Sequence, residues 1–295
     1  MALNIGRVGI WTSALDSQPT SSAQEAAAEL DELGFGALWI PEAVGRDPFV
    51  AAATLLSVTD RLVLASGIAN IYARDAMTMV AGQKTLAEAY PERFLLGLGV
   101  SHAHLVTNLR KHDYTKPYSH MERYLAAMSE ALFMAVGPPE DPPIVLAALG
   151  PKMLALAGRD AGGAHPYFAP VGHTAVAREV MGAGPLLAPE QMVVLESDPE
   201  KARGIARKGM AVYLRAPNYC NNLIRMGFSE EELQDGGSER LVDAIVAWGE
   251  LDAIVARVDE QHAAGADHVC LQVLTAGQNL PMAEWRELAS AVLNR

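Results

Sequence analysis

The stretch from residue 62 to residue 102 restricts the fold of this chain more than any other. Its two ends, Leu62–Ala69 and Arg93–Gly99, are apolar along almost their whole length, which predicts short strands that are buried on both faces. Between them, Ala76–Ala89 carries apolar residues at helical spacing. A helix between two buried strands is the crossover that a parallel pair requires. The stretch therefore predicts a parallel sheet covered by helices.

The same alternation of strand and helix continues along the chain. Apolar runs predict strands at Ile5–Trp11, Ala37–Pro41, Leu62–Ala69, Arg93–Gly99, Ile144–Ala148, Ala164–Phe168, Met192–Glu196 and Val269–Leu274. Helix signals lie between them. A capping box at Ser22 and Glu25 opens a helix that Gly34 ends, and Asp47-Pro48 caps another that runs to about Val58. Further helices are predicted over Ser119–Val136, Pro151–Arg159 and Met282–Leu293.

Eight strands that alternate with helices favour a (β/α)8 TIM barrel, with a doubly wound open sheet as the alternative. A length of 295 residues suits one barrel domain that spans residues 1–295. Residues 198–258 are too long for a single connection after the seventh strand. We expect a helical insertion in this segment and no second domain.

Charge and cysteine content narrow the class of protein. The formal net charge is −12 and the pI is about 5.1, so nucleic acid and anionic membranes are not expected as partners. Cys220 and Cys270 are far apart in sequence and match no metal spacing, which indicates reduced thiols in a cytoplasmic protein. The first residues lack the pattern of a signal peptide, and no apolar run is long enough for a membrane span.

The carboxyl ends of the predicted strands mark the candidate site, because active sites of such barrels lie there. Two neighbouring ends combine glycine with small or polar residues: Gly67, Ile68, Ala69 and Asn70, and one strand later Gly99, Val100, Ser101 and His102. Glycine lets the backbone approach a ligand closely. We therefore expect these two ends to lie side by side as a shelf for a flat molecule.

A second candidate site follows the fifth strand, where Leu149-Gly150-Pro151-Lys152 opens a helix. Free backbone N–H groups at a helix start, with Lys152 beside them, suit a phosphate group. A Gly-Pro pair is also a common helix start that binds nothing. On these residues alone, both interpretations stay open.

Other patterns carry less information. Gly97-x-Gly99 lacks the third glycine of a dinucleotide fingerprint. His102 and His104 have the spacing of metal ligands, but no carboxylate or cysteine is placed to complete a set, so no metal site is expected. Glu42 follows an apolar run and is either a buried acid or base or the cap of a neighbouring helix.

Taken together, several stretches resemble the bacterial luciferase-like flavin and deazaflavin oxidoreductases, and most of all the branch that uses coenzyme F420. The resemblance is carried by residues 30–42, 64–102, 143–168 and 246–274 and by the order of the strands. It implies a (β/α)8 barrel with insertions, commonly dimeric, with the cofactor ring at the carboxyl end of the barrel. In this family the third strand ends in a bulge with a non-proline cis peptide, which matches Gly67-Ile68 here.

The resemblance also implies roles for other residues. Asn70 would reach the pyrimidine edge of the ring, Gly99–His102 would flank the ring or its tail, and residues 149–152 would bind the phosphate. Pro166 and Tyr167, at the end of the sixth strand, are assigned to the cofactor site as well. Several relatives place a histidine directly after the acid that corresponds to Glu42, whereas this chain has Ala43. The proton donor must then lie elsewhere, with His102, His165 and Tyr167 as candidates.

These observations predict an F420-dependent oxidoreductase that passes a hydride between the deazaflavin and a small, fairly apolar substrate, with Glu42 and His102 as catalytic residues. An FMN-dependent monooxygenase of the same family is the first alternative. The second alternative is a protein that binds F420 without turnover, and a metal-dependent hydrolase is disfavoured. The resemblance further predicts a homodimer.

Overall fold

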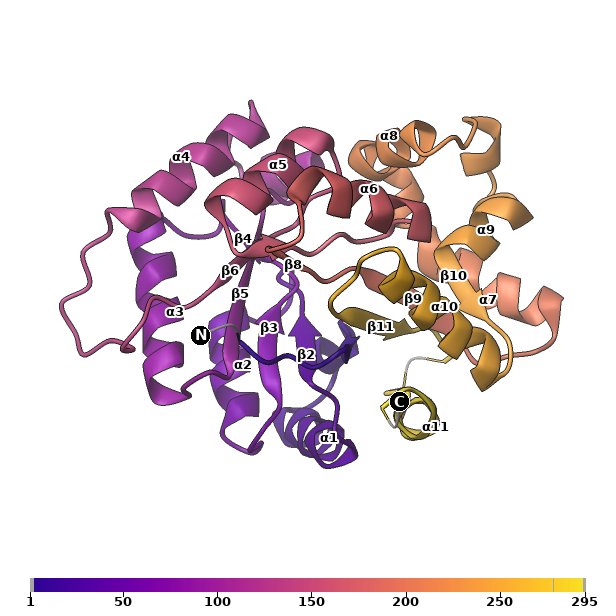
Figure 1. Ribbon diagram of the computed structural model, residues 1–295, viewed down its shortest axis with the longest axis horizontal. Helices are drawn as coiled ribbons and strands as arrows, with labels where there is room; N and C mark the ends of the chain where they lie inside the picture. The colour runs from indigo at the N-terminus through magenta and orange to yellow at the C-terminus, as the bar shows by residue number, and fades with distance from the viewer. Residues whose placement is uncertain (1–2, 278, 294–295) are drawn as a thin grey trace.

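The computed structural model describes residues 3–277 and 279–293 (Figure 1). Its strands are all parallel and form one sheet. Their bounds are β1 (Val8–Trp11), β2 (Ala37–Ile40), β3 (Val63–Ser66), β4 (Ala69–Asn70), β5 (Phe94–Gly99), β6 (Ile144–Leu146), β7 (Gly163–Ala164), β8 (Leu186–Leu187), β9 (Glu190–Val194), β10 (Val246–Trp248) and β11 (Val269–Val273).

The sheet closes into a ring at β8 and β9, which are consecutive pieces of one extended segment. The Ala188 N–H of this segment donates to the Ala164 carbonyl beyond β7, while the Cys270 N–H of β11 donates to the Pro189 carbonyl, both at 2.9 Å. Since β11 also pairs with β1, the described residues complete a ring of eight strand positions. The predicted (β/α)8 barrel is confirmed.

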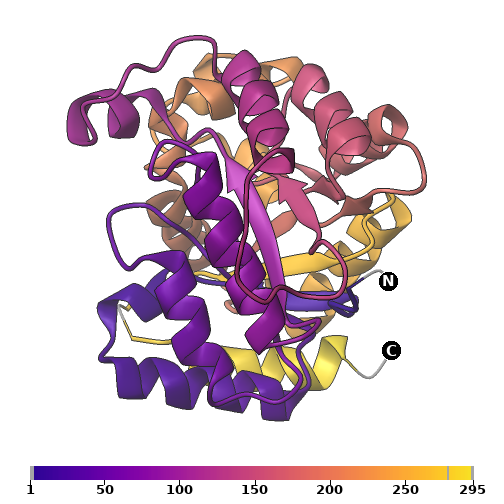
Figure 2. The ribbon, with the colours of Figure 1, turned by 90° about the vertical axis from the view of Figure 1, so that its left-hand side faces the viewer.

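Helices surround this ring. They are α1 (Thr20–Leu33), α2 (Pro48–Leu56), α3 (Ala76–Ala89), α4 (Pro117–Ser129), α5 (Pro151–Asp160), α6 (Val171–Met181), α7 (Pro199–Met210), α8 (Pro217–Arg225), α9 (Glu239–Ile245), α10 (Leu251–Ala263) and α11 (Met282–Val292), with short turns η1 (Ala14–Ser17), η2 (Leu105–Leu109), η3 (Tyr213–Arg215) and η4 (Glu231–Leu233). Figure 2 shows α3 lying across the strands of the first half of the chain. No helix in the described ranges is both long and apolar enough to cross a lipid bilayer.

Side chains alternate between two cores because successive residues of a strand point to opposite faces. In β2, Leu38 packs outward against the helices, whereas Ala37 and Trp39 point into the barrel. The barrel interior therefore holds rings and polar groups as well as aliphatic side chains, among them His165 and Glu190, which are 1% and 2% exposed.

Several predicted boundaries differ from the structure. The capping box at Ser22 is wrong, because α1 begins earlier, at Thr20, with Pro19 in the N-cap position, although Gly34 ends the helix as predicted. Asp47 caps α2, and Pro48 is its first residue, as predicted. The third strand is split into β3 and β4, and only Ala164 of the predicted sixth strand lies in a strand, β7.

The predicted helix Ser119–Val136 is also wrong in its second half, because α4 ends at Ser129. Three apolar residues lie beyond it, Leu132, Met134 and Val136, and none of them packs into the core. They are 72%, 93% and 80% exposed. Residues 198–258 contain α7, α8, α9 and part of α10, which Figure 1 shows gathered on one side of the barrel, together with the short strand β10.

Candidate active site

The bulge at the end of the third barrel strand is built by Gly67 and Ile68, which are joined by the predicted non-proline cis peptide bond. Backbone hydrogen bonds hold the bulge to the second strand: the Gly67 N–H donates to the Ile40 carbonyl at 2.8 Å, and the Glu42 N–H donates to the Ile68 carbonyl at 3.2 Å. From β1, the indole N–H of Trp11 donates to the Gly67 carbonyl at 3.0 Å. The ends of β1 and β2 therefore hold the bulge in position.

Position 67 has no room for a side chain. A Cβ atom there would lie 2.7 Å from Trp11 Nε1 and 3.2 Å from His165 Nε2. The His165 ring stacks on Trp39, with centroids 4.3 Å apart, and its Nδ1 lies 2.7 Å from the Ala188 carbonyl. Burial lowers the pKa of His165 to about 4. The ring is therefore neutral at pH 7, and its buried Nε2 has no hydrogen-bond partner among the described residues.

The two glycine-rich strand ends lie side by side, as predicted. β4 pairs with β5, and Asn70 lies opposite Gly99. A Cβ atom on Gly99 would lie 2.4 Å from Ile68 Cδ1, so the side chain of Ile68 occupies the space that a larger residue at 99 would need. The side-chain oxygen of Asn70 accepts a hydrogen bond from the Tyr72 N–H at 2.9 Å and so shapes its own loop.

Glu42 lies at the rim of the barrel mouth in an ion pair. Its carboxylate accepts two hydrogen bonds from the Arg74 guanidinium and one from the Asn70 backbone N–H, all at 2.8 Å. Arg110 lies 3.6 Å from the same carboxylate, and Arg74 also contacts Asp47 at 3.0 Å. Burial alone would lower the pKa of Arg74, but the hydrogen bonds and charges of its two acidic partners outweigh that effect and raise it.

These contacts are those of a positioning residue, since Glu42 fixes the strand end that carries Asn70. Its predicted catalytic role stays a prediction. Sequence reasoning missed Arg74 as its partner. The signal was available, because a lone arginine follows the candidate shelf within the loop NIYARD.

His102 follows β5 and faces the insertion. Its Nδ1 lies 3.1 Å from Asn218 Oδ1, and its ring lies 5.4 Å from that of Tyr219. Burial lowers the pKa of His102, and nearby His104 lowers it further, against the opposing effect of the hydrogen bond with Asn218. The backbone just before it is fixed by Ser101, whose φ is +56° and whose carbonyl accepts a hydrogen bond from Tyr114. The catalytic role of His102 also stays a prediction.

An aromatic wall closes the mouth on the side of the insertion; it consists of Trp11, Tyr167, Phe168, Tyr213 and Tyr219. The Tyr167 hydroxyl lies 2.5 Å from that of Tyr213 and donates to Gln272 at 2.6 Å. The Trp11 and Tyr167 rings are 4.9 Å apart. Tyr213 and Tyr219 come from η3 and α8 and were not predicted, because only the folding of the insertion back onto the barrel brings them there. Tyr167, which belongs to this wall, and the preceding Pro166 are both buried.

The candidate phosphate site has the predicted helix start. Gly150 is the N-cap residue of α5 and Pro151 is its first residue. A Cβ atom on Gly150 would meet no atom within 4 Å, so there is open space beside the first N–H groups of the helix. The Leu149 carbonyl lies 2.9 Å from His173 Nε2, which ties this loop to α6, and the Lys152 side chain is exposed. These features fit a phosphate group.

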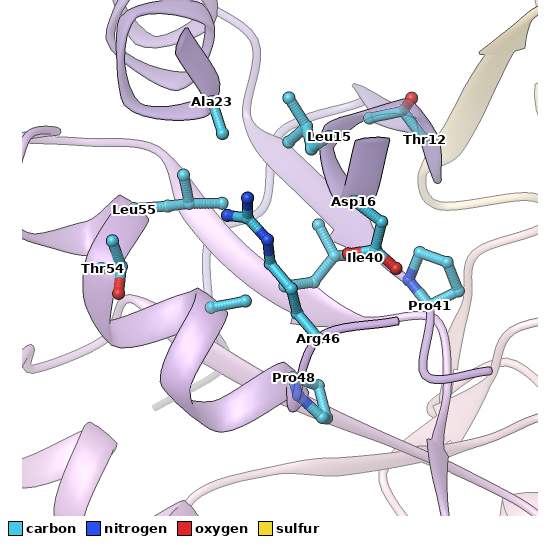
Figure 3. Close-up of a pocket in the computed structure, with 11 residues that line it drawn as sticks. Thr12, Leu15, Asp16, Ala23, Ile40, Pro41, Arg46, Pro48, Thr54 and Leu55 are labelled. Carbon is cyan, nitrogen blue, oxygen red and sulfur yellow. The ribbon is translucent and has the colours of Figure 1, made fainter. Parts of the chain in front are cut away.

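Two cavities near the mouth differ in size. The larger, of about 220 Å³, is lined by residues that follow β1 and by residues of α7 and β11, among them Thr12, Lys208 and Gln272. The smaller, of about 20 Å³, lies between η1 and α2, and Figure 3 shows the Arg46 side chain in its middle, with Leu15 and Leu55 close by. A space of that size holds about one water molecule. It is not a cofactor site.

Comparison with known proteins agrees with this fold. A sequence model of the luciferase-like monooxygenase family matches residues 6–268. A protein of Mycobacterium tuberculosis that is provisionally named a coenzyme F420-dependent oxidoreductase is 23% identical, over 97% of each chain.

Solved structures with the same fold bind two different cofactors. An F420-dependent secondary alcohol dehydrogenase in complex with an F420–acetone adduct superposes with a TM-score of 0.79 at 13% identity, over 97% of this chain and 98% of that one. The oxygenating constituent of a type II Baeyer–Villiger monooxygenase from Pseudomonas putida, in complex with FMN, superposes with a TM-score of 0.70 at 14% identity, over 96% and 95% of the two chains.

Proposed function

The chain belongs to the luciferase-like monooxygenase family, and on that premise we propose that it is a coenzyme F420-dependent oxidoreductase. Its reaction would transfer a hydride between the deazaflavin and a small organic substrate. The observation that carries the proposal is the shelf at the barrel mouth, where the Gly67-Ile68 bulge lies beside Gly99, together with a helix start at Gly150 that fits a phosphate group. The M. tuberculosis relative and the alcohol dehydrogenase support the choice of cofactor.

The residues present suit each part of such a cofactor. Ile68, Ala69 and Asn70 would face the ring, and the first N–H groups of α5, with Lys152 nearby, would bind the phosphate of the tail. F420, when bound, supplies the hydride chemistry, while the protein supplies binding and orientation. Trp11 and Arg74 hold the shelf through Gly67 and Glu42.

The substrate would be small and largely apolar, because the wall opposite the shelf is aromatic. Tyr167, Tyr213 and Tyr219 offer ring faces and hydroxyl groups and carry no positive charge. Burial raises the pKa of Tyr167 well above its usual value, so its hydroxyl stays protonated and donates its hydrogen to Gln272. His102, which is partly exposed, is our first candidate for moving the proton that accompanies the hydride.

Two alternatives share this fold. An FMN-dependent monooxygenase is favoured by the FMN complex of the P. putida protein. A protein that binds F420 without turnover is favoured by Ala43, since it replaces the catalytic histidine of several relatives.

The deciding experiment titrates the purified protein with F420 and, separately, with FMN, and follows the fluorescence of each cofactor. We expect micromolar or tighter binding of F420 and no response to FMN. Selective FMN binding would replace the proposal with the monooxygenase. Tight F420 binding without reduction by a broad panel of alcohols and other hydride donors would favour the non-catalytic alternative.

We further propose that the protein is a cytoplasmic homodimer. Light scattering should then give about twice the chain mass of 31.5 kDa. A mass of one chain at micromolar concentration would contradict the dimer.

A further inference from the structure

Glu190 is a carboxylic acid inside the barrel that the proposed reaction does not use. It lies on β9, paired with Cys270 of β11, and is 2% exposed. Its neighbour Gln191 points outward and contacts Gln261 of α10, so the pleat turns Glu190 inward. Glu190 Oε2 accepts a hydrogen bond from the Phe168 N–H at 3.1 Å, and Oε1 has no partner within the described ranges.

The groups around Glu190 offer it no positive charge. They are the Cys270 thiol of β11, the Tyr167 hydroxyl beyond β7, and the hydroxyls of Tyr213 in η3 and Tyr219 in α8, and a charge on Glu190 raises the pKa of each. The nearest imidazole is that of His165, 3.8 Å from the Cys270 sulfur, and it is neutral. No ion pair joins Glu190 to a lysine, arginine or histidine in the described part of the chain.

Because removing a charge from water without a partner is costly, a carboxyl in this place favours its neutral form. Burial raises the pKa of Glu190 to about 8, although the hydrogen bond from Phe168 lowers it. Phe168 itself has a φ of +53°, a conformation that costs energy for a bulky residue and needs support. The hydrogen bond to Glu190 supplies that support at the base of the aromatic wall.

We propose that Glu190 is a positioning residue that acts in its protonated form, and that its ionisation loosens the aromatic wall of the barrel mouth. A buried carboxylate must gain water, and the groups packed around Glu190 include Tyr167 and Tyr219, which are only 9% and 8% exposed. Hydration of the charge therefore separates the rings from one another and from Phe168.

The sign of the pH dependence follows from the raised pKa. The unfolded chain loses the Glu190 proton near its ordinary pKa, whereas the folded chain keeps it up to about pH 8. The protonated Glu190 side chain therefore makes its full contribution to the free energy of unfolding below about pH 5. This contribution falls as the pH rises from about 5 to about 8, and it is fully lost above that range. The variant Glu190→Gln keeps the shape and an acceptor for Phe168 but cannot ionise.

The test compares the melting temperatures of the wild type and Glu190→Gln between pH 5 and pH 9.5. We expect the melting temperature of the variant, relative to that of the wild type, to rise steadily from about pH 5 to pH 8. Above that range the difference should stay constant. A difference that does not change with pH would overturn the proposal. If the variant does not fold, infrared spectroscopy of the wild type at pH 7 should show the carbonyl band of a neutral carboxylic acid, and its absence would be equally decisive.

A second readout reports on the wall itself and rests on the proposed function. Raising the pH one unit above the pKa leaves about a tenth of the protein protonated, which weakens apparent F420 affinity by up to about tenfold if only that form binds. Glu190→Gln should lose this dependence, while the titration of F420 itself is common to both proteins. Equal pH profiles would show that the wall does not respond to Glu190. If F420 binds to neither protein at any pH, the proposed function fails, and the melting curves still decide the role of Glu190.

Discussion

Glu42 at the rim of the barrel mouth and Glu190 inside the barrel are both largely withdrawn from water, but their partners differ. Glu42 has an 8% exposed side chain and meets Arg74 in a bidentate ion pair, with Arg110 close by. Glu190 meets one backbone N–H, a set of neutral rings and one thiol. The same carboxyl group is thus a paired anion in one region and favours the neutral acid in the other.

The rim and the interior of the barrel support the shelf by different kinds of interaction. At the rim, charge fixes the backbone, because Glu42 holds the N–H of Asn70. In the interior, aromatic packing and neutral hydrogen bonds support the shelf from below through Trp11 and His165. A ligand on the shelf would therefore touch groups that two kinds of interaction position independently.

The largest effect should come from breaking the rim with Arg74→Ala. Removing Arg74 leaves the largely buried Glu42 carboxylate with only the more distant Arg110 as a charged partner, which we expect to lower the free energy of unfolding by about 3 kcal/mol. Urea denaturation measures this loss. Arg74→Lys keeps the charge but not the two-pronged geometry, and it should recover only part of the stability.

Arg110→Ala is the matched control, since Arg110 lies 3.6 Å from the same carboxylate and its side chain is 29% exposed. It should cost less than about 1 kcal/mol. Equal losses for Arg74→Ala and Arg110→Ala would contradict the bidentate pair as the main support of Glu42.

A smaller loss of stability is expected for Gly67→Ala, which adds a methyl group to the bulge between the rim and the interior. Its new methyl group would lie 2.7 Å from Trp11 Nε1, so the indole or the bulge must move. Overpacking of this kind costs about 2 kcal/mol, and F420 affinity should fall with it. Thermal and urea denaturation report the stability.

Gly150→Ala controls for the loss of a glycine at the site. Position 150 has open space around it and a φ of −83°, which any residue adopts, so the fold should keep its stability. A loss of stability at position 150 as large as that at position 67 would mean that crowding beneath the bulge is not the cause.

The smallest loss of stability is expected for Asp47→Asn, which tests how much Asp47 adds to the ion pair at the rim. Asp47 contacts Arg74 at 3.0 Å, but its side chain is 47% exposed. Asparagine caps a helix about as well as aspartate, so α2 keeps its N-cap. The change should cost no more than about 0.5 kcal/mol by urea denaturation, because exposed ion pairs contribute little. A loss of stability as large as that of Arg74→Ala would show that Asp47, Arg74 and Glu42 act as one coupled network.

The order of strands and helices could be predicted from the sequence because it depends on local patterns. Buried strands such as Phe94–Gly99 are continuous apolar runs, and Asp47-Pro48 carries its own helix start. Gly67 and Gly99 marked the shelf for the same reason, since glycine is the residue that close backbone approach requires. Local patterns failed beyond Ser129, where apolar residues lie outside any helix.

Only the tertiary structure decided which partners the functional side chains meet. Glu42 and Arg74 are separated by 32 residues, and Glu190 and Phe168 by 22. Nothing in either glutamate's local sequence distinguishes an ion pair from a buried acid, because the protonation state depends on the charges and the water that the folded chain leaves nearby. The aromatic wall has the same origin, since Tyr213 reaches Tyr167 only after the insertion has folded onto the barrel.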